Sequence, residues 1–174
     1  MTVFCVLLGA VPALILVWCV LLAPRRGQAG WEALSGARYA HRGLHDLSRG
    51  RPENSMAAFR AAVEAGFGAE LDVHLMAGGA LAVVHDSSLR RVCGRDAAIE
   101  DLTAAELKDY PLQGTAERIP LLEDVLALFE GKTPLIIELK AERGNAAALT
   151  DAVMSALDGW QGTYCIESFH PAVL

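Results

Sequence analysis

The feature that most constrains the fold is an alternation of short apolar segments, typical of strands, with segments that repeat apolar residues at helical spacing. The expected strands cover 38–43, 70–75, 81–84, 135–140 and 163–169, and the expected helices begin near residues 55, 103, 120 and 145. Strands that alternate with helices favour parallel βαβ units. The sequence therefore predicts an α/β fold with a largely parallel sheet.

Polar side chains gather near the ends of four of the expected strands. They form the groups His41-Arg42, Glu70-x-Asp72, Glu138-x-Lys140 and Glu167-Ser168. In α/β sheets and barrels, ligands bind at the carboxyl ends of the strands. Packing of a hydrophobic core does not explain charged residues at four strand ends, so we expect a functional site at this edge of the sheet.

The segment between the second and third strands predicts a hairpin. Only five residues separate Leu75 from Leu81, which is too few for a parallel crossover. A Gly-Gly pair at 78–79 suits a two-residue turn. In that register Asp72 lies directly opposite His85, with Glu70 on the same face as Asp72. The hairpin would thus bring two carboxylates and an imidazole together.

Three carboxylates are candidate metal ligands. Glu70 and Asp72 share one face of their strand, and two acids this close repel each other unless a cation lies between them. Glu138 follows the apolar run 135–137, where a charged residue is expected to be paired or metal-bound. Three converging carboxylates would suit a hard divalent cation, Mg²⁺ or Ca²⁺.

Two histidines and one arginine complete the candidate set. His41 and His85 could each be a satisfied core histidine, but their position beside carboxylates favours general acid–base chemistry. Arg42 suits a phosphate ligand because a guanidinium binds phosphate through two hydrogen bonds, although a surface charge is an equal alternative. We expect Arg90, Arg91 and Arg95 to form a solvated face.

The first residues of the chain resemble a membrane anchor. Residues 3–23 carry no charge and would span about 32 Å as a helix, enough for a bilayer core of roughly 30 Å. A cleaved signal peptide is the alternative, but no Lys or Arg precedes the segment. We expect a single-pass anchor over 1–24 and a linker over 25–37. Arg25 and Arg26 favour a cytoplasmic catalytic domain.

The motifs together resemble those of the glycerophosphodiester phosphodiesterase family. The resemblance rests on six motifs in order: His41-Arg42-Gly43, Pro52-Glu53-Asn54-Ser55, Glu70-Leu71-Asp72-Val73, His85-Asp86, Glu138-Leu139-Lys140 and Ser168-Phe169. The family usually has Thr where this chain has Ser55, which keeps the hydroxyl that can cap a helix. The resemblance covers about 130 residues.

This resemblance implies an activity and a set of roles. The family implies metal-dependent hydrolysis of glycerophosphodiesters to sn-glycerol 3-phosphate and an alcohol, within lipid metabolism. It implies His41 and His85 as acid and base, a divalent cation held by Glu70, Asp72 and Glu138, phosphate contacts from Arg42 and Lys140, and Glu53 close to the metal. The partner is then a small phosphodiester. The net charge of −6 argues against nucleic acid.

The family also implies a TIM-type (β/α) barrel, which needs eight strands and typically about 250 residues. We count four barrel strands, so we expect residues 38–174 to hold only the first half of such a domain, with its carboxyl-terminal part missing. Whether this piece alone is active stays open at this point. Two alternatives remain open. One is a phospholipase D-like or phosphoinositide-type lipase on the same fold, and the other is a non-catalytic, membrane-tethered binding fragment.

Overall fold

The structure, a computed structural model, describes residues 2–21 and 30–173. The chain divides into two compact units, Met1–Trp31 and Glu32–Leu174. The first unit contains helix α1, Thr2–Leu21, with Pro12 inside it. Among the described residues, we find no helix with both the length and the apolar character needed to cross a membrane. The predicted anchor is therefore not confirmed, and its end, with the first part of the linker (22–29), lies outside the described residues.

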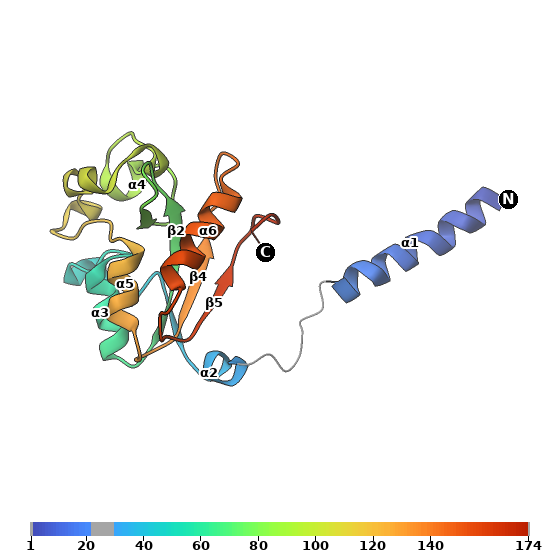
Figure 1. Ribbon diagram of the computed structural model, residues 1–174, viewed down its shortest axis with the longest axis horizontal. Coiled ribbons are helices and arrows are strands. Elements are labelled where there is room, and N and C mark those ends of the chain that lie inside the picture. Colours follow the sequence, from blue (N-terminus) through green and yellow to red (C-terminus); the bar gives the residue numbers. More distant parts are fainter. Residues whose placement is uncertain (1, 22–29, 174) are drawn as a thin grey trace. The chain divides into compact units, whose positions relative to one another are not determined.

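The second unit is built on a five-stranded sheet (Figure 1). Its strands are β1 (Tyr39–His41), β2 (Gly68–Leu75), β3 (Leu81–Val83), β4 (Leu135–Leu139) and β5 (Tyr164–Glu167). Four of them are parallel in the order β1-β2-β4-β5, and β3 pairs with β2 in the antiparallel sense. The predicted α/β fold with a parallel sheet is confirmed, and the four parallel strands are those counted from the sequence.

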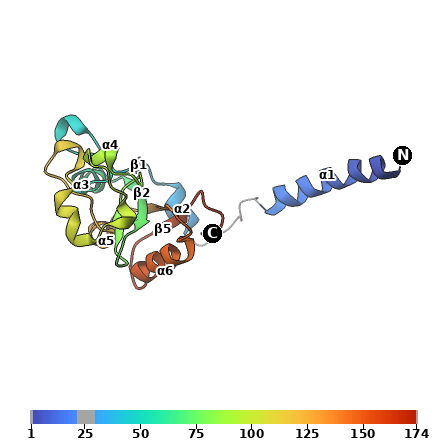
Figure 2. The same cartoon turned by 90° about the horizontal axis from the view of Figure 1, so that it is seen from above.

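Helices α3, α5 and α6 pack against this sheet (Figure 1 and Figure 2), where α3 and α6 contact β2 and α5 contacts β3. The helices of the second unit are α2 (Trp31–Ser35), α3 (Met56–Glu64), α4 (Arg90–Cys93), α5 (Leu122–Phe129) and α6 (Ala146–Leu157). The short 3-10 helices are η1 (Leu47–Arg49), η2 (Ile99–Asp101), η3 (Ala104–Asp109) and η4 (Leu112–Gly114). Helix α2 lies inside the segment that we expected to be a linker.

The main core lies between the sheet and these helices. Leu71 and Val73 of β2 are fully buried and belong to the same apolar cluster as Phe59 of α3 and Phe129 of α5. The two phenylalanine rings meet edge to face, with centroids 6.0 Å apart. Because side chains alternate across a strand, Glu70, Asp72 and His74 project to the opposite face of the sheet. That face carries the acidic residues.

A second apolar cluster lies under the long segment between β3 and α5. Its buried members include Val84, Leu89, Val92, Ile99 and Leu107. This cluster is a small hydrophobic core for a segment of loops and short helices. Because the segment has this core, its residues next to the sheet hold fixed positions. His85 and Asp86 lie at the start of this segment.

The hairpin is confirmed, but its predicted register is wrong. Leu75 pairs with Leu81, and the backbone N–H of Met76 donates to the carbonyl oxygen of Ala80 at 2.8 Å, so the loop has three residues. Three-residue loops are a common hairpin connection, and both glycines of this one have positive φ. The partner of Asp72 is consequently Val84, and His85 lies beyond the end of β3 rather than opposite Asp72.

Candidate active site

The register of the parallel strands brings the candidate acids to one edge of the sheet. His41 of β1 pairs with Glu70 of β2, and Asp72 pairs with Glu138 of β4. Glu138 in turn pairs with Glu167 of β5. His41, Glu138 and Glu167 lie at or next to the carboxyl ends of β1, β4 and β5, which is where α/β folds bind ligands, and β2 continues past Glu70 and Asp72 into the hairpin.

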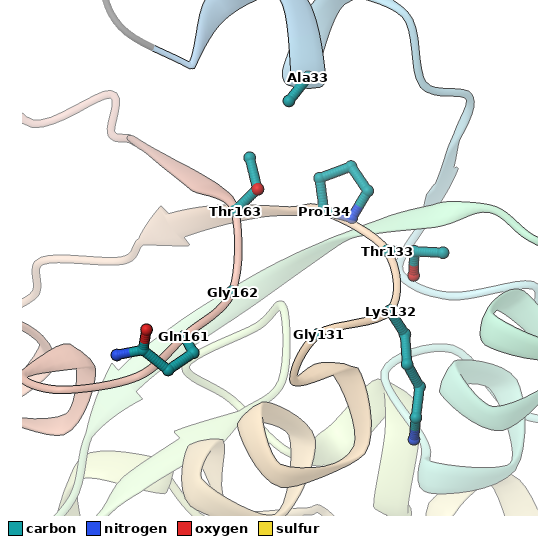
Figure 3. Close-up of a pocket in the computed structure, with 8 residues that line it drawn as sticks. All are labelled: Ala33, Gly131, Lys132, Thr133, Pro134, Gln161, Gly162 and Thr163. Carbon is teal, nitrogen blue, oxygen red and sulfur yellow. The ribbon is translucent and has the colours of Figure 1, made fainter.

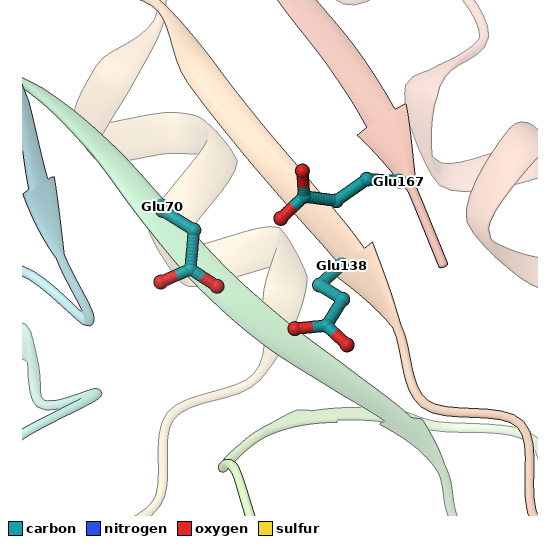
Figure 4. A group of neighbouring side chains, drawn as sticks. All are labelled: Glu70, Glu138 and Glu167. Carbon is teal, nitrogen blue, oxygen red and sulfur yellow. The ribbon is translucent and has the colours of Figure 1, made fainter. Parts of the chain in front are cut away.

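Three of these carboxylates converge. Oxygen atoms of Glu70, Glu138 and Glu167 all lie within 4.8 Å of one another (Figure 4). Burial, followed by the charge of Asp72, raises the pKa of Glu70 to about 7. Burial, followed by the charge of Glu138, also raises the pKa of Glu167. Such a group is more stable with a cation among its oxygens.

Asp72 lies beside this cluster and has its own partners. Its side chain is 1% exposed, and its Oδ2 accepts a hydrogen bond from Asn54 Nδ2 at 2.8 Å. Its Oδ1 lies 3.1 Å from Lys140 Nζ but accepts no hydrogen bond in the described structure. Lys140 Nζ also contacts Glu138 Oε1 at 2.7 Å. Asp72 thus adds a fourth carboxylate beside Glu70, Glu138 and Glu167, and a group of carboxylate oxygens fits a hard divalent cation.

Arg42 ends β1 in a conformation that few side chains adopt. Its φ is +57°, and its backbone N–H donates to Glu70 Oε2 at 3.0 Å. Its Nη1 donates to Glu53 Oε1 at 2.9 Å, and its Nε lies 3.7 Å from Asp72 Oδ2. Gly43 follows it at φ +79°, where an added Cβ would lie 2.9 Å from Ala58 Cβ of α3. The tight turn therefore holds the guanidinium against the acidic cluster.

Glu53 and Asp86 are joined by Arg91. The Arg91 guanidinium donates to both Glu53 oxygens at 2.9 and 2.7 Å, and its Nε donates to Asp86 Oδ2 at 2.5 Å. The hydrogen bonds from Arg91 hold the pKa of Glu53 below its usual range. Arg91 is exposed, as expected, but its side chain also links two segments of the site.

The two candidate histidines differ in exposure and in partners. The His41 side chain is 70% exposed, and its Nε2 lies 3.8 Å from Glu70 Oε2. His85 Nδ1 lies 2.6 Å from Asp86 Oδ1. Although burial raises the pKa of Asp86, hydrogen bonds from Arg91 and His85 lower it below its usual value. Asp86 is thus an ionised acceptor, so Nδ1 of His85 carries the hydrogen and Nε2 remains available for proton transfer.

Two cavities lie at opposite ends of the strands. One of about 270 Å³ opens beside Glu138, Lys140 and Phe169 at the carboxyl ends. The other, of about 320 Å³, lies before β4 and β5 (Figure 3). Among the residues that the structure describes, Lys132 is the sole charged residue that lines it, and no carboxylate does. The first cavity therefore adjoins the candidate site, whereas the second offers no comparable chemistry.

The structure adds three residues to which we had assigned no role in the site: Asn54, Asp86 and Arg91. Glu167 was among the polar groups expected at the strand ends, and it lies beside Glu138 because β4 and β5 are parallel. Ser55 caps α3 by accepting from the N–H of Ala58 at 3.1 Å, whereas the amide of Asn54 donates to Asp72. Nothing in the sequence pattern pointed to Arg91, because its partner Glu53 is distant along the chain.

Comparison with curated proteins finds several relatives of this chain. A glycerophosphodiester phosphodiesterase of Bacillus altitudinis is 34% identical over 143 residues, which are 76% of this chain and 57% of that protein. Lysophospholipase D GDPD1 of Rattus norvegicus is 39% identical over 101 residues, which are 51% of this chain and 32% of that protein. The chain spans about half the length of the curated relatives it matches.

Several solved structures share the fold of this chain. A glycerophosphodiester phosphodiesterase of Parabacteroides distasonis has a TM-score of 0.66 at 30% identity, over 79% of this chain and 58% of that one. A phosphodiesterase of Oleispira antarctica, solved in complex with the product sn-glycerol-3-phosphate, has a TM-score of 0.70 at 27% identity, over 81% of this chain and 61% of that one. The chain corresponds to part of the TIM-type barrel of these proteins.

The sequence profile of one family matches most of the chain. The match covers residues 41–174, which include every candidate site residue. It begins at His41 and so leaves out α1 and α2. On this match, together with the relatives and structures above, the chain belongs to the glycerophosphoryl diester phosphodiesterase family.

Proposed function

We propose that this site hydrolyses glycerophosphodiesters to sn-glycerol 3-phosphate and an alcohol. The observation that carries the proposal is the convergence of Glu70, Glu138 and Glu167 beside two cationic side chains, Arg42 and Lys140. Acids alone would repel a phosphodiester, whereas acids that hold a cation next to two such side chains would attract one. The membership of the family and the named activity of the Bacillus altitudinis relative support the same reaction.

The residues that would hold the divalent cation are Glu70, Glu138 and Asp72, with Glu167 as a further carboxylate. Mg²⁺ or Ca²⁺ bound there would neutralise the phosphodiester and stabilise the charge that develops in the transition state. Lys140 balances two of these carboxylates, Asp72 and Glu138, and remains near enough to a phosphate to contact it. Arg42 is oriented by Glu53 and presents a planar donor group to the same place.

His85 and His41 would carry the proton transfers. The Asp86 carboxylate fixes the ring of His85 with Nε2 available, as a general acid or base requires. His41 lies beside Glu70 with an exposed ring, from which it can reach a substrate atom. One histidine takes the proton of the attacking hydroxyl, from water or from the glycerol of the substrate, and the other gives a proton to the leaving alcohol. Where the glycerol hydroxyl attacks, the product of this step is a cyclic phosphate, which water opens in a second step to give glycerol 3-phosphate.

The test is hydrolysis of glycerophosphocholine by the purified chain, followed through the glycerol 3-phosphate formed. We expect activity that a chelator removes and that Mg²⁺ or Ca²⁺ restores. His85→Ala and His41→Ala should each lower kcat on the order of 10²–10⁴-fold. The exposed His45, which does not line the cavity beside Lys140, gives the matched control His45→Ala, which should leave kcat unchanged. Full activity in both site variants would refute the assignment.

A second candidate reaction is removal of the head group from a lysophospholipid. Its support is the likeness to lysophospholipase D GDPD1 of Rattus norvegicus, together with the cavity beside Lys140, where the ring of Phe169 is 93% exposed. An exposed aromatic ring at a cavity suits an acyl chain. Lysophosphatidylcholine should then be turned over faster than glycerophosphocholine, and Phe169→Ser should reverse that preference.

A further inference from the structure

A buried ion pair lies next to the site but contains none of the groups proposed to react. His74 of β2 is 1% exposed, and the side chain of Glu100 in η2 is 8% exposed. His74 Nδ1 lies 2.7 Å from Glu100 Oε1. Charged groups are rarely buried unless their pairing has a use, and neither residue contacts the acidic cluster.

Both ring nitrogens of His74 face oxygen acceptors. Nε2 lies 3.2 Å from the backbone carbonyl oxygen of His85, which can only accept a hydrogen bond. Although burial raises the pKa of Glu100, hydrogen bonds from His74 and Ser87 lower it to about 2, so this carboxylate also accepts. The imidazole ring of His74 thus contacts Glu100 through one nitrogen and the backbone of His85 through the other, and it connects the two.

Glu100 also reaches the same loop from its other oxygen. Ser87 Oγ donates to Glu100 Oε2 at 2.7 Å. The backbone fixes η2 beside this loop, since the N–H of Ile99 donates to the carbonyl oxygen of Ser87 at 2.9 Å. The residues on both sides of Asp86 are therefore held, His85 through its carbonyl group and Ser87 through its hydroxyl.

These contacts hold the backbone near His85, which lies beyond the paired strands of the hairpin. β3 ends at Val83, so no ladder of hydrogen bonds fixes the backbone of His85. Without another anchor, the imidazole would depend on Asp86 alone, an adjacent residue of the same loop. The pair formed by His74 and Glu100 ties this loop to β2, the strand that carries two of the candidate metal ligands.

We propose that His74 and Glu100 are positioning residues that set the location of His85 for proton transfer. The inference rests on the proposed function, in which His85 reacts with the substrate. A residue that acts only through His85 must lose its effect when the imidazole is removed, whereas a residue that supports the fold in general must not.

The kinetic test uses His74→Gln and Glu100→Gln, each alone and combined with His85→Ala, with glycerophosphocholine and an excess of Mg²⁺ or Ca²⁺. We expect each single variant to lower kcat by about 10-fold to 10²-fold with KM nearly unchanged, because a misplaced reacting group costs rate rather than binding. In the His85→Ala background, neither substitution should lower kcat further. Equal losses in both backgrounds would overturn the proposal.

The matched control is Val153→Ala, which removes two methyl groups from a fully buried site in α6, away from the histidines. It lowers stability without touching the loop, so kcat at a temperature where all variants are folded should stay at the wild-type value. If Val153→Ala lowers kcat as much as His74→Gln, the loss reflects stability and the proposal fails.

A measurement that needs no activity separates this proposal from the proposed function. Amide hydrogen exchange of residues 84–89 should become at least about tenfold faster in His74→Gln and in Glu100→Gln, while exchange in 135–139 stays unchanged. Unchanged exchange in 84–89 would overturn the positioning role even in an active enzyme. If the wild-type chain hydrolyses no phosphodiester while exchange responds as expected, the proposed function fails and the positional effect of the pair stands.

Discussion

Arg91 holds the carboxylate of Glu53 through two hydrogen bonds, at 2.9 and 2.7 Å, although 38 residues separate the two along the chain. Glu53 also accepts a hydrogen bond from Arg42, and Arg91 also binds Asp86, the partner of His85. One guanidinium thus connects the turn after β1 with the loop after β3. The proposed phosphate ligand and the proposed proton donor or acceptor share one ionic network.

The first prediction concerns this network. Arg91→Lys keeps the charge but loses the planar group that contacts both oxygens of Glu53. We expect kcat/KM for glycerophosphocholine to fall about 10-fold, a loss of about 1.4 kcal/mol of transition-state stabilisation. The thermal midpoint should hardly change, because Arg91 is half exposed and such pairs contribute little. Arg90→Lys, in the exposed pair with Asp96, is the control and should be silent.

The second prediction concerns protons released by metal binding. Burial, aided by the charge of Asp72, gives Glu70 a pKa of about 7 in the metal-free protein, so about half of these carboxyl groups are protonated at pH 7. A metal ligand must be ionised, so binding of Mg²⁺ or Ca²⁺ should release about half a proton. Titration calorimetry in buffers of different ionisation enthalpy measures this number.

Two comparisons make this measurement decisive. At pH 9 Glu70 is already ionised, so the released fraction should fall towards zero. Glu70→Gln should remove the release at pH 7 and weaken the binding. A metal affinity and a proton count that do not change between pH 6 and pH 9 would contradict a role for Glu70 as a ligand.

The third prediction concerns Lys140, whose ammonium lies 3.1 Å from Asp72 and 2.7 Å from Glu138. Lys140→Met leaves these two buried acids without their shared cation. We expect the metal-free protein to lose about 2–4 kcal/mol of unfolding free energy, as when one partner of a buried pair is removed. Excess Mg²⁺ or Ca²⁺ should restore most of it.

Urea unfolding with a chelator and then with the metal measures both effects. The exposed Lys108→Met is the control and should show neither. If added metal stabilises Lys140→Met no more than the wild type, the acids near Lys140 do not share the proposed cation.

The parallel sheet could be predicted from the sequence because it depends on local patterns. The β-branched run Leu135–Leu139 and the apolar spacing within α3 and α5 reflect burial on the helix side of the sheet, which strand and helix periodicity record directly. The position of the polar residues at the strand ends could be predicted from the same strand pattern. Glu70, Asp72 and Glu138 do meet at one edge because parallel strands align their carboxyl ends.

The register of the hairpin could not be predicted because it depends on the choice of turn. Loops of two and three residues are both common, and two successive glycines suit either one. A change of one residue moves every following side chain to the other face of the sheet. Here the three-residue loop gives Asp72 the partner Val84, and the location of His85 is then determined by contacts with His74 and Asp86.

The fourth prediction concerns acid stability. Burial opposes ionisation of Glu100, but hydrogen bonds from His74 and Ser87 prevail and lower its pKa to about 2, below the usual 4.5. Because the folded-state pKa is the lower one, the stabilisation is complete above pH 4.5 and is lost as the pH falls from 4.5 to 2. After allowance for screening, Glu100→Gln should remove about 1–2 kcal/mol of unfolding free energy at pH 7 and much less near pH 2.5. Urea unfolding at several pH values measures this difference.

Glu106→Gln, in the exposed capping box with Thr103, is the control, since its carboxylate is hydrogen-bonded but fully accessible to water. The same dependence on pH in both variants would show that the buried pair with His74 contributes no special stability.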